Sequence, residues 1–293
     1  MAPQLKVGFL GLGIMGTAMA RNLLKSGLFA DVVVWNRSST KCEELVKEGA
    51  KTAATPAEVV KQCDITFAVL ADPSAALEVV FGAQGVLEGL SASKGYVDMS
   101  TVDESTSQKI AEAVTAKGGR FLEAPVSGSK QPAINGQLII LSAGDKGLYE
   151  EALPAFSKMG KKSLFLGAVG AGARMKLIVN SVMGCMMGTL CEGMSLADKA
   201  GLAQGDLLEV LSLGAIACPM FAQKGPTIQA RNYPAAFPLK HQQKDLRLAL
   251  ELGEKLGQPL PQAATANAAY RAAIDMGHGD SDFAAVHEAI CKK

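Results

Sequence analysis

Three glycines near the start of the chain have the spacing of a turn that binds a dinucleotide, in the stretch KVGFLGLGIMG. In a Gly-x-Gly-x-x-Gly turn the first glycine permits a tight bend, the second lets the backbone reach a pyrophosphate, and the third lets helix and strand approach closely. The N–H groups that open the following helix then bind the anion. The alternative is a glycine-rich turn with no ligand. The residues that we assign to the cofactor are Gly11, Leu12, Gly13, Ile14, Met15 and Gly16.

The end of the next expected strand indicates which dinucleotide is bound. An NAD site usually has Asp or Glu there to accept hydrogen bonds from the ribose 2′-hydroxyl, whereas this chain has Asn36, Arg37 and Ser38. A guanidinium and a short hydroxyl suit the additional 2′-phosphate of NADP. We therefore expect these three residues to bind NADPH rather than NADH. The alternative is that Arg37 is a solvated charge and that Ser38 only caps a helix.

A lysine and an asparagine four residues apart, in the stretch GAGARMKLIVN, are candidates for proton chemistry. On a helix, Lys176 and Asn180 share one face. The three residues between them are apolar and could partly desolvate the lysine, which would make it a better acid than an exposed one. The same two residues also occur on ordinary polar helix faces, so the pair alone leaves both interpretations open.

The elements that must position these residues alternate between strand and helix in the first half of the chain. Strands are expected at residues 5–10, 31–36, 64–70, 95–100, 120–126 and 137–144. Helices are expected at 17–27, at 38–48, from Thr55-Pro56 onward, at 74–81 and at 104–117. Apolar strands that alternate with helices are typical of an α/β fold with a parallel, doubly wound sheet of the Rossmann type.

The pattern changes after about residue 165, where strand signals stop and helical signals dominate. One long helix is expected over about 171–200. Breaks follow at Gly201, at Cys218-Pro219, between Pro226 and Pro238, and at Gln258-Pro259. We expect an NADP-binding Rossmann domain at 1–165 and an all-helical domain for substrate binding and oligomerisation at 166–293, joined by the long helix. A chain of 293 residues is long enough for two domains.

Composition argues against nucleic acid and membrane partners. Lys and Arg total 29 and Asp and Glu total 28, so no overall charge attracts polyanions. No stretch without a charged residue or His is longer than Leu177–Cys191, which is shorter than the ~20 residues that span a bilayer. We therefore expect a small-molecule ligand, with no nucleic acid and no membrane partner.

The metal-ligating residue types are dispersed. The six cysteines form no C-x-x-C pair and the three histidines do not cluster, so no metal site is expected. Scattered cysteines also fit a reducing compartment. The N-terminal apolar run has no basic leader or cleavage signal, and the final residues AICKK lack the Ser-Lys-Leu signal, so we expect a cytoplasmic protein.

Six ordered motifs make the chain resemble the β-hydroxyacid dehydrogenase family over essentially its full length. That family includes 3-hydroxyisobutyrate dehydrogenases, tartronate semialdehyde reductases and glyoxylate/succinic semialdehyde reductases. The motifs are GFLGLGIMG at 8–16, NRS at 36–38, DMST at 98–101, EAPVSGS at 123–129, GAGARMKLIVN at 170–180 and KDLRLAL at 244–250. One of them alone would be weak, but the ordered set is specific.

The resemblance implies that Lys176 is the catalytic group. As hydride from the nicotinamide attacks an aldehyde carbon, negative charge grows on the oxygen, and the Lys176 ammonium would stabilise and protonate it. Asn180 would hold the lysine or the substrate oxygen in place. The residues that would bind the substrate carboxylate are Ser127, Gly128 and Ser129, through hydroxyl and backbone N–H groups. By residue type alone, Ser-Gly-Ser is also an ordinary turn at the end of a strand.

Further roles follow from the same resemblance. Thr101 comes just after an expected strand, at the edge where open parallel sheets bind ligands, and would contact both nicotinamide and substrate. Lys244 would contact the cofactor, while Asp245 and Phe237 would line the substrate pocket. The alternatives are a solvated charge pair for the first two and core packing for Phe237. The loop that would cover the adenosine side of the cofactor is Leu70, Ala71 and Asp72, or else a helix start before a proline.

Within the family, the stretches LGAIACPMFAQKGP at 213–226 and AFPLKHQQKD at 236–245 look most like the plant-type glyoxylate/succinic semialdehyde reductases. This similarity implies NADPH-dependent reduction of glyoxylate to glycolate and of succinic semialdehyde to 4-hydroxybutyrate. A 3-hydroxyisobutyrate or tartronate semialdehyde enzyme is the alternative, since a few pocket residues separate these substrates. A different class is a non-catalytic oligomeric scaffold, as in relatives that lost the lysine. Family habit implies a homodimer or homotetramer.

Overall fold

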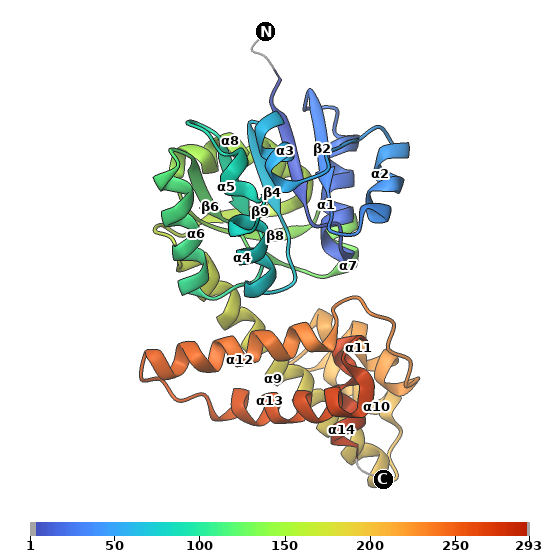
Figure 1. Cartoon of the computed structure of the whole chain (residues 1–293). Helices are drawn as coiled ribbons and strands as arrows, with labels where there is room; N and C mark the ends of the chain where they lie inside the picture. Colours follow the sequence, from blue (N-terminus) through green and yellow to red (C-terminus); the bar gives the residue numbers. More distant parts are fainter. Residues whose placement is uncertain (1–3, 292–293) are drawn as a thin grey trace. The chain divides into compact units, whose positions relative to one another are not determined.

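The protein forms two compact units, residues 1–176 and 177–293, in a computed structural model that describes residues 4–291 (Figure 1). The division falls inside one long helix rather than at residue 165. The first unit is an α/β structure and the second is helical, as the sequence predicts.

Six strands of the first unit form a parallel sheet. They are β1 (Lys6–Leu10), β2 (Asp31–Trp35), β3 (Lys51–Thr52), β4 (Ile65–Ala68), β5 (Gly95–Asp98) and β6 (Arg120–Glu123), in the spatial order β3-β2-β1-β4-β5-β6. The chain first runs outward from β1 to β3 and then returns to the other side of β1 at β4. This reversal is the doubly wound order of a Rossmann fold, whose ligands bind where the strand order reverses.

The far edge of the sheet corrects the expectation that all strands are parallel. The expected strand 120–126 divides at Ala124-Pro125, and the pieces β6 and β7 (Val126–Ser127) both pair antiparallel with β8 (Leu138–Gly144). Strand β9 (Gly160–Phe165) then pairs parallel with β8 and was not expected from the sequence. Proline lacks the N–H that an uninterrupted ladder needs, which is consistent with a break at this position.

Helices pack on both faces of the sheet, so the first unit has two cores (Figure 1). Because successive side chains of a strand point to opposite faces, Phe9 and Phe67 belong to one core and Leu10 and Ala68 to the other. Helices α1 (Ile14–Lys25), α2 (Glu43–Lys47), α7 (Lys130–Ile134) and α8 (Lys146–Met159) cover the first core. Helices α3 (Pro56–Gln62), α4 (Pro73–Phe81), α5 (Val86–Gly89) and α6 (Glu104–Ala116) cover the second.

Several of these helices differ from the predicted ones. The expected helix 38–48 is a 3₁₀ turn, η1 (Ser39–Cys42), followed by the short α2. Helix α1 begins at Ile14, so the third glycine of the turn lies within the helix. The sequence pattern did not predict α5, α7 and α8.

The second unit is built from helices around one main core, beside a small separate cluster of Leu177, Leu248 and Ala249. The helices are α9 (Ala171–Lys199, which begins in the first unit), α10 (Gln204–Leu213), α11 (Pro219–Gln229), α12 (Leu239–Lys255), α13 (Pro261–Ala273) and α14 (His287–Ile290). Short turns at Ile274–His278 and Phe283–Val286 complete it. Figure 1 shows α12 and α13 side by side, and both contribute buried residues to the core. Within the described residues, the strand-type pairing here is one bridge between Pro238 and Asp282.

Helix α9 is long and apolar enough to cross a membrane by length and composition, with a mean hydropathy of 1.3 over its most apolar window. The same properties are typical of a helix in a protein core, and Met187, Leu190 and Met194 of α9 are buried in the core of the second unit. The absence of a membrane partner therefore stays a prediction from the sequence.

Candidate functional site

The carboxyl ends of the parallel strands meet at one edge of the sheet. The register places Leu10 opposite both Trp35 and Ala68, and Ala68 opposite Asp98, which is in turn opposite Glu123. The first-unit loops predicted to bind the cofactor follow the ends of β1, β2, β4 and β5, whereas the Ser127-Gly128-Ser129 turn follows β7, which runs antiparallel to β8. Open parallel sheets bind ligands at this edge.

The glycine turn between β1 and α1 has two glycines that the fold itself requires. Gly11 has a φ of +91° and would place a Cβ 2.3 Å from the Val69 carbonyl oxygen. A Cβ on Gly16 would lie 1.9 Å from the carbonyl oxygen of Gly11. Gly13 is different, because a Cβ there would meet no atom within 4 Å. Packing therefore does not explain Gly13, whereas the close approach of a ligand does.

The start of α1 is suited to an anion. Gly13 is the N-cap residue and offers no side-chain acceptor to the first N–H groups of the helix, which therefore remain available to a phosphate. Gly13 and Ile14 are exposed, while the Leu12 side chain is buried in the core beneath them. A ligand at this turn can therefore contact the backbone, whereas the Leu12 side chain is buried away from it.

The three residues predicted to select NADPH have distinct surroundings. The Asn36 side chain accepts a hydrogen bond from Leu12 N over 2.9 Å and donates one to the Ser38 carbonyl over 3.0 Å, so it joins this loop to the glycine turn. The Arg37 side chain is 84% exposed and lies 3.8 Å from the Glu78 carboxylate, which is also exposed. An exposed pair of that length restrains little. Ser38 occupies an N-cap position, but its hydroxyl makes no cap bond and pairs with Thr40.

The loops after β4 and β5 are joined by a hydrogen bond. Leu70 N donates to the Ser100 hydroxyl over 2.9 Å, which fixes these loops side by side at the strand ends. Thr101 is half-buried just beyond. Asp72 caps α4, since its carboxylate accepts from Ala75 N over 2.8 Å. The Asp72 side chain thus caps a helix that starts at a proline, which was the alternative interpretation of this loop. Ala71, the residue before it, is exposed.

The Ser127-Gly128-Ser129 turn connects β7 to the short helix α7. Gly128 has a φ of +129°, and a Cβ there would lie 2.7 Å from the Leu138 side chain, so the turn requires glycine. Ser129 is the N-cap residue of α7, yet its hydroxyl does not cap the helix. Both serines are half-buried. Their hydroxyls are thus placed where they can hydrogen-bond a small anionic ligand.

Lys176 and Asn180 lie one turn apart on the continuous helix α9, as their spacing predicts. Lys176 is the last residue of the first unit and is 6% exposed, and Asn180 is 1% exposed. A lysine this secluded from water is unusual on a purely solvated helix face. The interpretation as an ordinary polar face is therefore wrong for this pair.

Asn180 belongs to a buried polar cluster between α9 and α12. Its side-chain amide donates to Asp245 Oδ2 over 2.5 Å, and Asp245 Oδ1 lies 3.0 Å from Lys244 Nζ. Gln242 Nε2 donates to the Asn180 carbonyl over 2.9 Å. All four residues are at least nine-tenths buried. The alternative of a solvated pair is thus wrong for Lys244 and Asp245. Sequence reasoning missed Gln242.

Phe237 packs in the second unit, edge to face with Phe283 at 5.8 Å between ring centroids. Its backbone N–H donates to Asp282 Oδ2 over 3.2 Å. Asp282 also forms a buried ion pair with Lys224 at 2.7 Å. Core packing therefore explains part of the surroundings of the Phe237 side chain. No sequence motif indicated the Lys224–Asp282 ion pair, whose carboxylate accepts a hydrogen bond from the Phe237 backbone.

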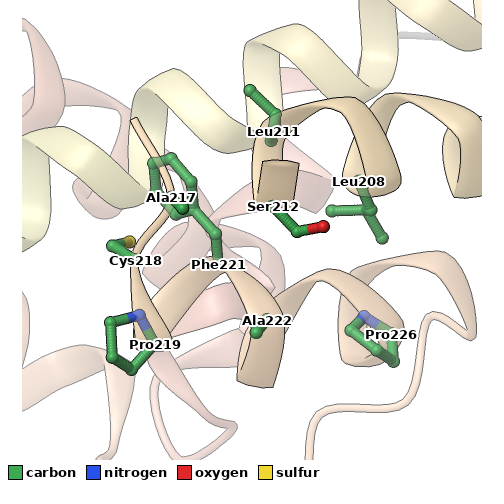
Figure 2. Close-up of a pocket in the computed structure, with 9 residues that line it drawn as sticks. All are labelled: Leu208, Leu211, Ser212, Ala217, Cys218, Pro219, Phe221, Ala222 and Pro226. Atoms are coloured by element: carbon green, nitrogen blue, oxygen red, sulfur yellow. The ribbon is translucent and has the colours of Figure 1, made fainter. Parts of the chain in front are cut away.

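A pocket of about 330 Å³ lies between α10 and α11 (Figure 2). Leu208, Leu211 and Ser212 of α10 line one side, and Phe221, with its neighbours on α11, lines the other. Residues predicted to bind cofactor or substrate do not line this pocket. Among residues 4–291, no group of three or more His, Cys, Asp and Glu side chains is placed to hold a metal ion.

Two family models match consecutive parts of the chain. The model described as the NAD binding domain of 6-phosphogluconate dehydrogenase matches residues 6–169. The model described as the NAD-binding region of NADP-dependent 3-hydroxyisobutyrate dehydrogenase matches residues 170–290. Together they cover both units and the helix that connects them.

Individual relatives are similar over nearly the whole chain. Glyoxylate/succinic semialdehyde reductase 1 of Arabidopsis thaliana is 59% identical, over 98% of each chain. Cytokine-like nuclear factor N-PAC of Homo sapiens is 49% identical over 97% of this chain but only 51% of its own length. The crystal structure of 3-hydroxyisobutyrate dehydrogenase from Salmonella typhimurium matches with a TM-score of 0.89 and 27% identity, over 97% of this chain and 99% of that one.

Proposed function

The chain belongs to the β-hydroxyacid dehydrogenase family, and on that premise we propose that it uses NADPH to reduce small aldehyde acids. It is an oxidoreductase with a nicotinamide cofactor. The proposed reactions are glyoxylate to glycolate and succinic semialdehyde to 4-hydroxybutyrate. The observation that carries the choice of substrate is the 59% identity to a reductase named for both aldehydes.

The residues around α1 fit a dinucleotide, and those after β2 favour NADP. Gly13 and the uncapped start of α1 leave room and donors for a pyrophosphate. The three side chains directly after β2, Asn36, Arg37 and Ser38, include no carboxylate to accept from a ribose 2′-hydroxyl, and Arg37 is exposed and loosely paired. An exposed guanidinium with only a weak partner can bind a 2′-phosphate without first breaking strong contacts within the protein. The bound nicotinamide supplies the hydride.

Lys176 has the proposed catalytic role. Its ammonium would donate a hydrogen bond to the aldehyde oxygen, stabilise the charge that develops there, and deliver the proton that completes the hydroxyl group. Each turnover consumes one proton, which the lysine regains from water. Asn180, whose amide is held by Asp245, would keep the reacting oxygen and the lysine in line.

The carboxylate of the substrate would be recognised by the Ser127-Gly128-Ser129 turn. Two hydroxyls and the backbone N–H groups of a turn can together hold a carboxylate. Thr101 would contact the substrate and the nicotinamide, Leu70 and Ala71 the adenosine side of the cofactor, and Lys244 the cofactor. Phe237 would form an apolar wall. A 3-hydroxyisobutyrate or tartronate semialdehyde enzyme stays the alternative within this family.

A non-catalytic scaffold is the alternative of another class. The N-PAC protein named above is similar to almost the whole of this chain, and this chain spans about half of N-PAC. Lys176 and the buried cluster of Asn180, Lys244 and Asp245 favour the enzyme. Burying charged groups is unfavourable, so a scaffold with no chemistry to perform has little reason to maintain them.

Initial rates of NADPH oxidation with a panel of aldehyde acids test the proposal. Glyoxylate and succinic semialdehyde should give kcat/KM values at least about tenfold above those of tartronate and methylmalonate semialdehydes. The reverse order would support the alternative within the family. Absence of turnover with every aldehyde acid, in a sample that binds NADPH, would favour the scaffold.

We also propose a cytoplasmic homodimer or homotetramer. Cys42, Cys63, Cys185, Cys191, Cys218 and Cys291 are all free thiols, which suits a reducing compartment. Light scattering at micromolar concentration would distinguish two from four copies, and a monomer would contradict this part of the proposal.

A further inference from the structure

Glu123 is a buried carboxylate to which the proposed mechanism gives no role. It ends β6 and is 2% exposed. The chain continues from it through Ala124-Pro125 into β7 and the Ser127-Gly128-Ser129 turn. Burial raises the pKa of its carboxyl group, and several hydrogen bonds oppose that effect. A buried carboxylate destabilises the fold unless it is hydrogen-bonded, so the groups that bond to Glu123 indicate what it holds in place.

The Glu123 carboxylate bonds the start of α9. Oε1 accepts from the backbone N–H groups of Gly170 and Gly172, each over 2.7 Å. Oε2 accepts from the Ser107 hydroxyl of α6. The first N–H groups of a helix have no partner within the helix, and an anion placed there is stabilised by the helix dipole. Glu123 thus acts as an internal anion that binds and orients the first turn of α9.

The backbone at this contact is shaped to receive the carboxylate. A Cβ on Gly172 would lie 3.1 Å from Glu123 Oε1 and 2.5 Å from the carbonyl oxygen of Leu141. Gly170 has a φ of +99°, which favours glycine. On the outer side, Arg174 pairs with Glu104 of α6. The first turn of α9 is therefore attached at several points to β6 and α6.

Lys176 lies one helical turn beyond Gly172. In an α-helix the N–H of a residue bonds the carbonyl four positions earlier, so the backbone of Lys176 is tied directly to Gly172. Glu123 fixes Gly172, and Gly172 fixes the turn from which Lys176 extends. The same Glu123 precedes the turn proposed to hold the substrate carboxylate by four residues.

We propose that Glu123 is a positioning residue that sets Lys176 relative to the Ser127-Gly128-Ser129 turn. This inference rests on the proposed function, in which Lys176 is the proton donor. One carboxylate thereby connects β6, which leads to the proposed substrate turn, with α9, which carries the lysine. A misplacement of about 1 Å can lower a rate by roughly 10²-fold.

Two substitutions separate the hydrogen bonds of Glu123 from its charge. Glu123→Gln keeps an oxygen for both glycine N–H groups and turns an amide toward the Ser107 hydroxyl, whereas Glu123→Ala loses every bond. We expect kcat to fall by about 30- to 100-fold in Glu123→Ala, and by less than about threefold in Glu123→Gln. The dissociation constant of NADPH should change little in either. Equal losses in the two variants would assign the effect to charge and overturn the proposal.

A double-substitution cycle tests whether Glu123 acts through Lys176. In a Lys176→Ala background, adding Glu123→Ala should lower the single-turnover rate by less than about threefold, because the group it positions is gone. If the full loss persists in that background, the carboxylate acts elsewhere and the proposal is wrong. Glu58→Ala is a matched control, since Glu58 also accepts a backbone N–H near a helix start, from Ala54 over 2.9 Å, but on α3.

Hydrogen exchange provides a readout that does not depend on turnover. Amides of residues 171–176 should exchange at least about tenfold faster in Glu123→Ala than in the parent, and at parent rates in Glu123→Gln. Unchanged exchange in Glu123→Ala would overturn the proposal. If the parent reduces no aldehyde acid, the proposed function fails and the exchange result alone decides whether Glu123 fixes this turn. If Glu123→Ala does not fold, Ser107→Ala replaces it, with a smaller increase expected.

Discussion

The side-chain amide of Asn180 donates a hydrogen bond to Oδ2 of Asp245 over 2.5 Å in the interior of the helical unit. The other oxygen of the same carboxylate lies 3.0 Å from Lys244 Nζ. One carboxylate therefore orients an amide on α9 and neutralises a cation on α12. Asn180 is also one helical turn from Lys176, so this cluster determines what lies next to the proposed proton donor.

Asp245→Asn should destabilise the protein and slow catalysis. The substitution removes the negative charge that Asp245 places 3.0 Å from the buried Lys244 ammonium, and loss of one partner of a buried pair costs about 3 kcal/mol in the free energy of unfolding. The Asn180 amide also loses a charged acceptor, so we expect kcat to fall roughly tenfold or more. Urea unfolding and steady-state kinetics measure the two effects.

Glu251→Gln on the same helix is the control for that substitution. Glu251 pairs with Arg247 at 2.7 Å, but both side chains are about half exposed. Its loss should change the free energy of unfolding by about 0.5 kcal/mol or less and leave kcat unchanged. If both substitutions gave similar small effects, the Asp245 cluster would have no special role.

Alanine at two positions of the glycine turn should have opposite consequences. In Gly13→Ala the new Cβ meets no atom within 4 Å, so thermal stability should be kept while NADPH binding weakens. In Gly16→Ala the Cβ would lie 1.9 Å from a backbone oxygen, so the fold itself should be destabilised. Differential scanning calorimetry and fluorescence titration with NADPH distinguish these results. Unchanged affinity in Gly13→Ala would argue against a pyrophosphate at this turn.

Arg37→Ala should reduce affinity for NADPH and leave affinity for NADH nearly unchanged. The guanidinium is 84% exposed, so its removal should have little effect on stability. Loss of a charge-assisted contact to the 2′-phosphate should raise the dissociation constant of NADPH by about 10- to 100-fold. Equal weakening of both cofactors, or of neither, would contradict NADP selection by Arg37.

The stability of the helical unit should fall as the pH drops below about 6.5. Burial lowers the pKa of His287, and its ring contacts the hydroxyls of Ser195 and Tyr233, each at 3.3 Å. The unfolded chain therefore binds a proton near pH 6.5 that the folded chain resists, and stability is lost as pH falls through that range. Melting temperatures at pH 7.5, 6.5 and 5.5 measure the effect.

His287→Gln is expected to flatten this pH dependence, while His278→Gln, at a half-buried histidine, is expected to keep it. Measurements at pH 5.5 and above limit the contribution of carboxylates such as Glu288. Burial raises the pKa of Glu288, but the Tyr233 hydrogen bond and the nearby Arg231 outweigh it and lower the pKa, so its stabilising charge is lost only at more acidic pH. A parent protein with equal stability at all three pH values would refute the assignment.

Local patterns in the sequence predicted much of the fold. The turn at Gly11–Gly16, the strand that ends at Trp35 and the helix begun by Thr55-Pro56 each depend on residues close in the chain. The antiparallel edge formed by β6, β7 and β8 was not predicted, because an apolar run does not specify the direction of its partner.

The site was predictable where motifs mark it and not where tertiary contacts complete it. The spacing made Lys176 and Asn180 candidates and the family resemblance gave them roles, but Gln242, which bonds the Asn180 carbonyl, is 62 residues away. Glu123 lies 47 and 49 residues from the two glycines that it binds. Nothing near these side chains in the sequence indicates such partners, which appear only when strands and helices pack.

The most direct test of the account is the single-turnover rate of hydride transfer with saturating NADPH and glyoxylate, compared between the parent and Lys176→Ala. Removal of the proton donor should lower this rate by about 10³-fold and leave the dissociation constant of NADPH within about twofold. Equal rates in the two proteins would contradict the assignment of Lys176 as the group that protonates the substrate.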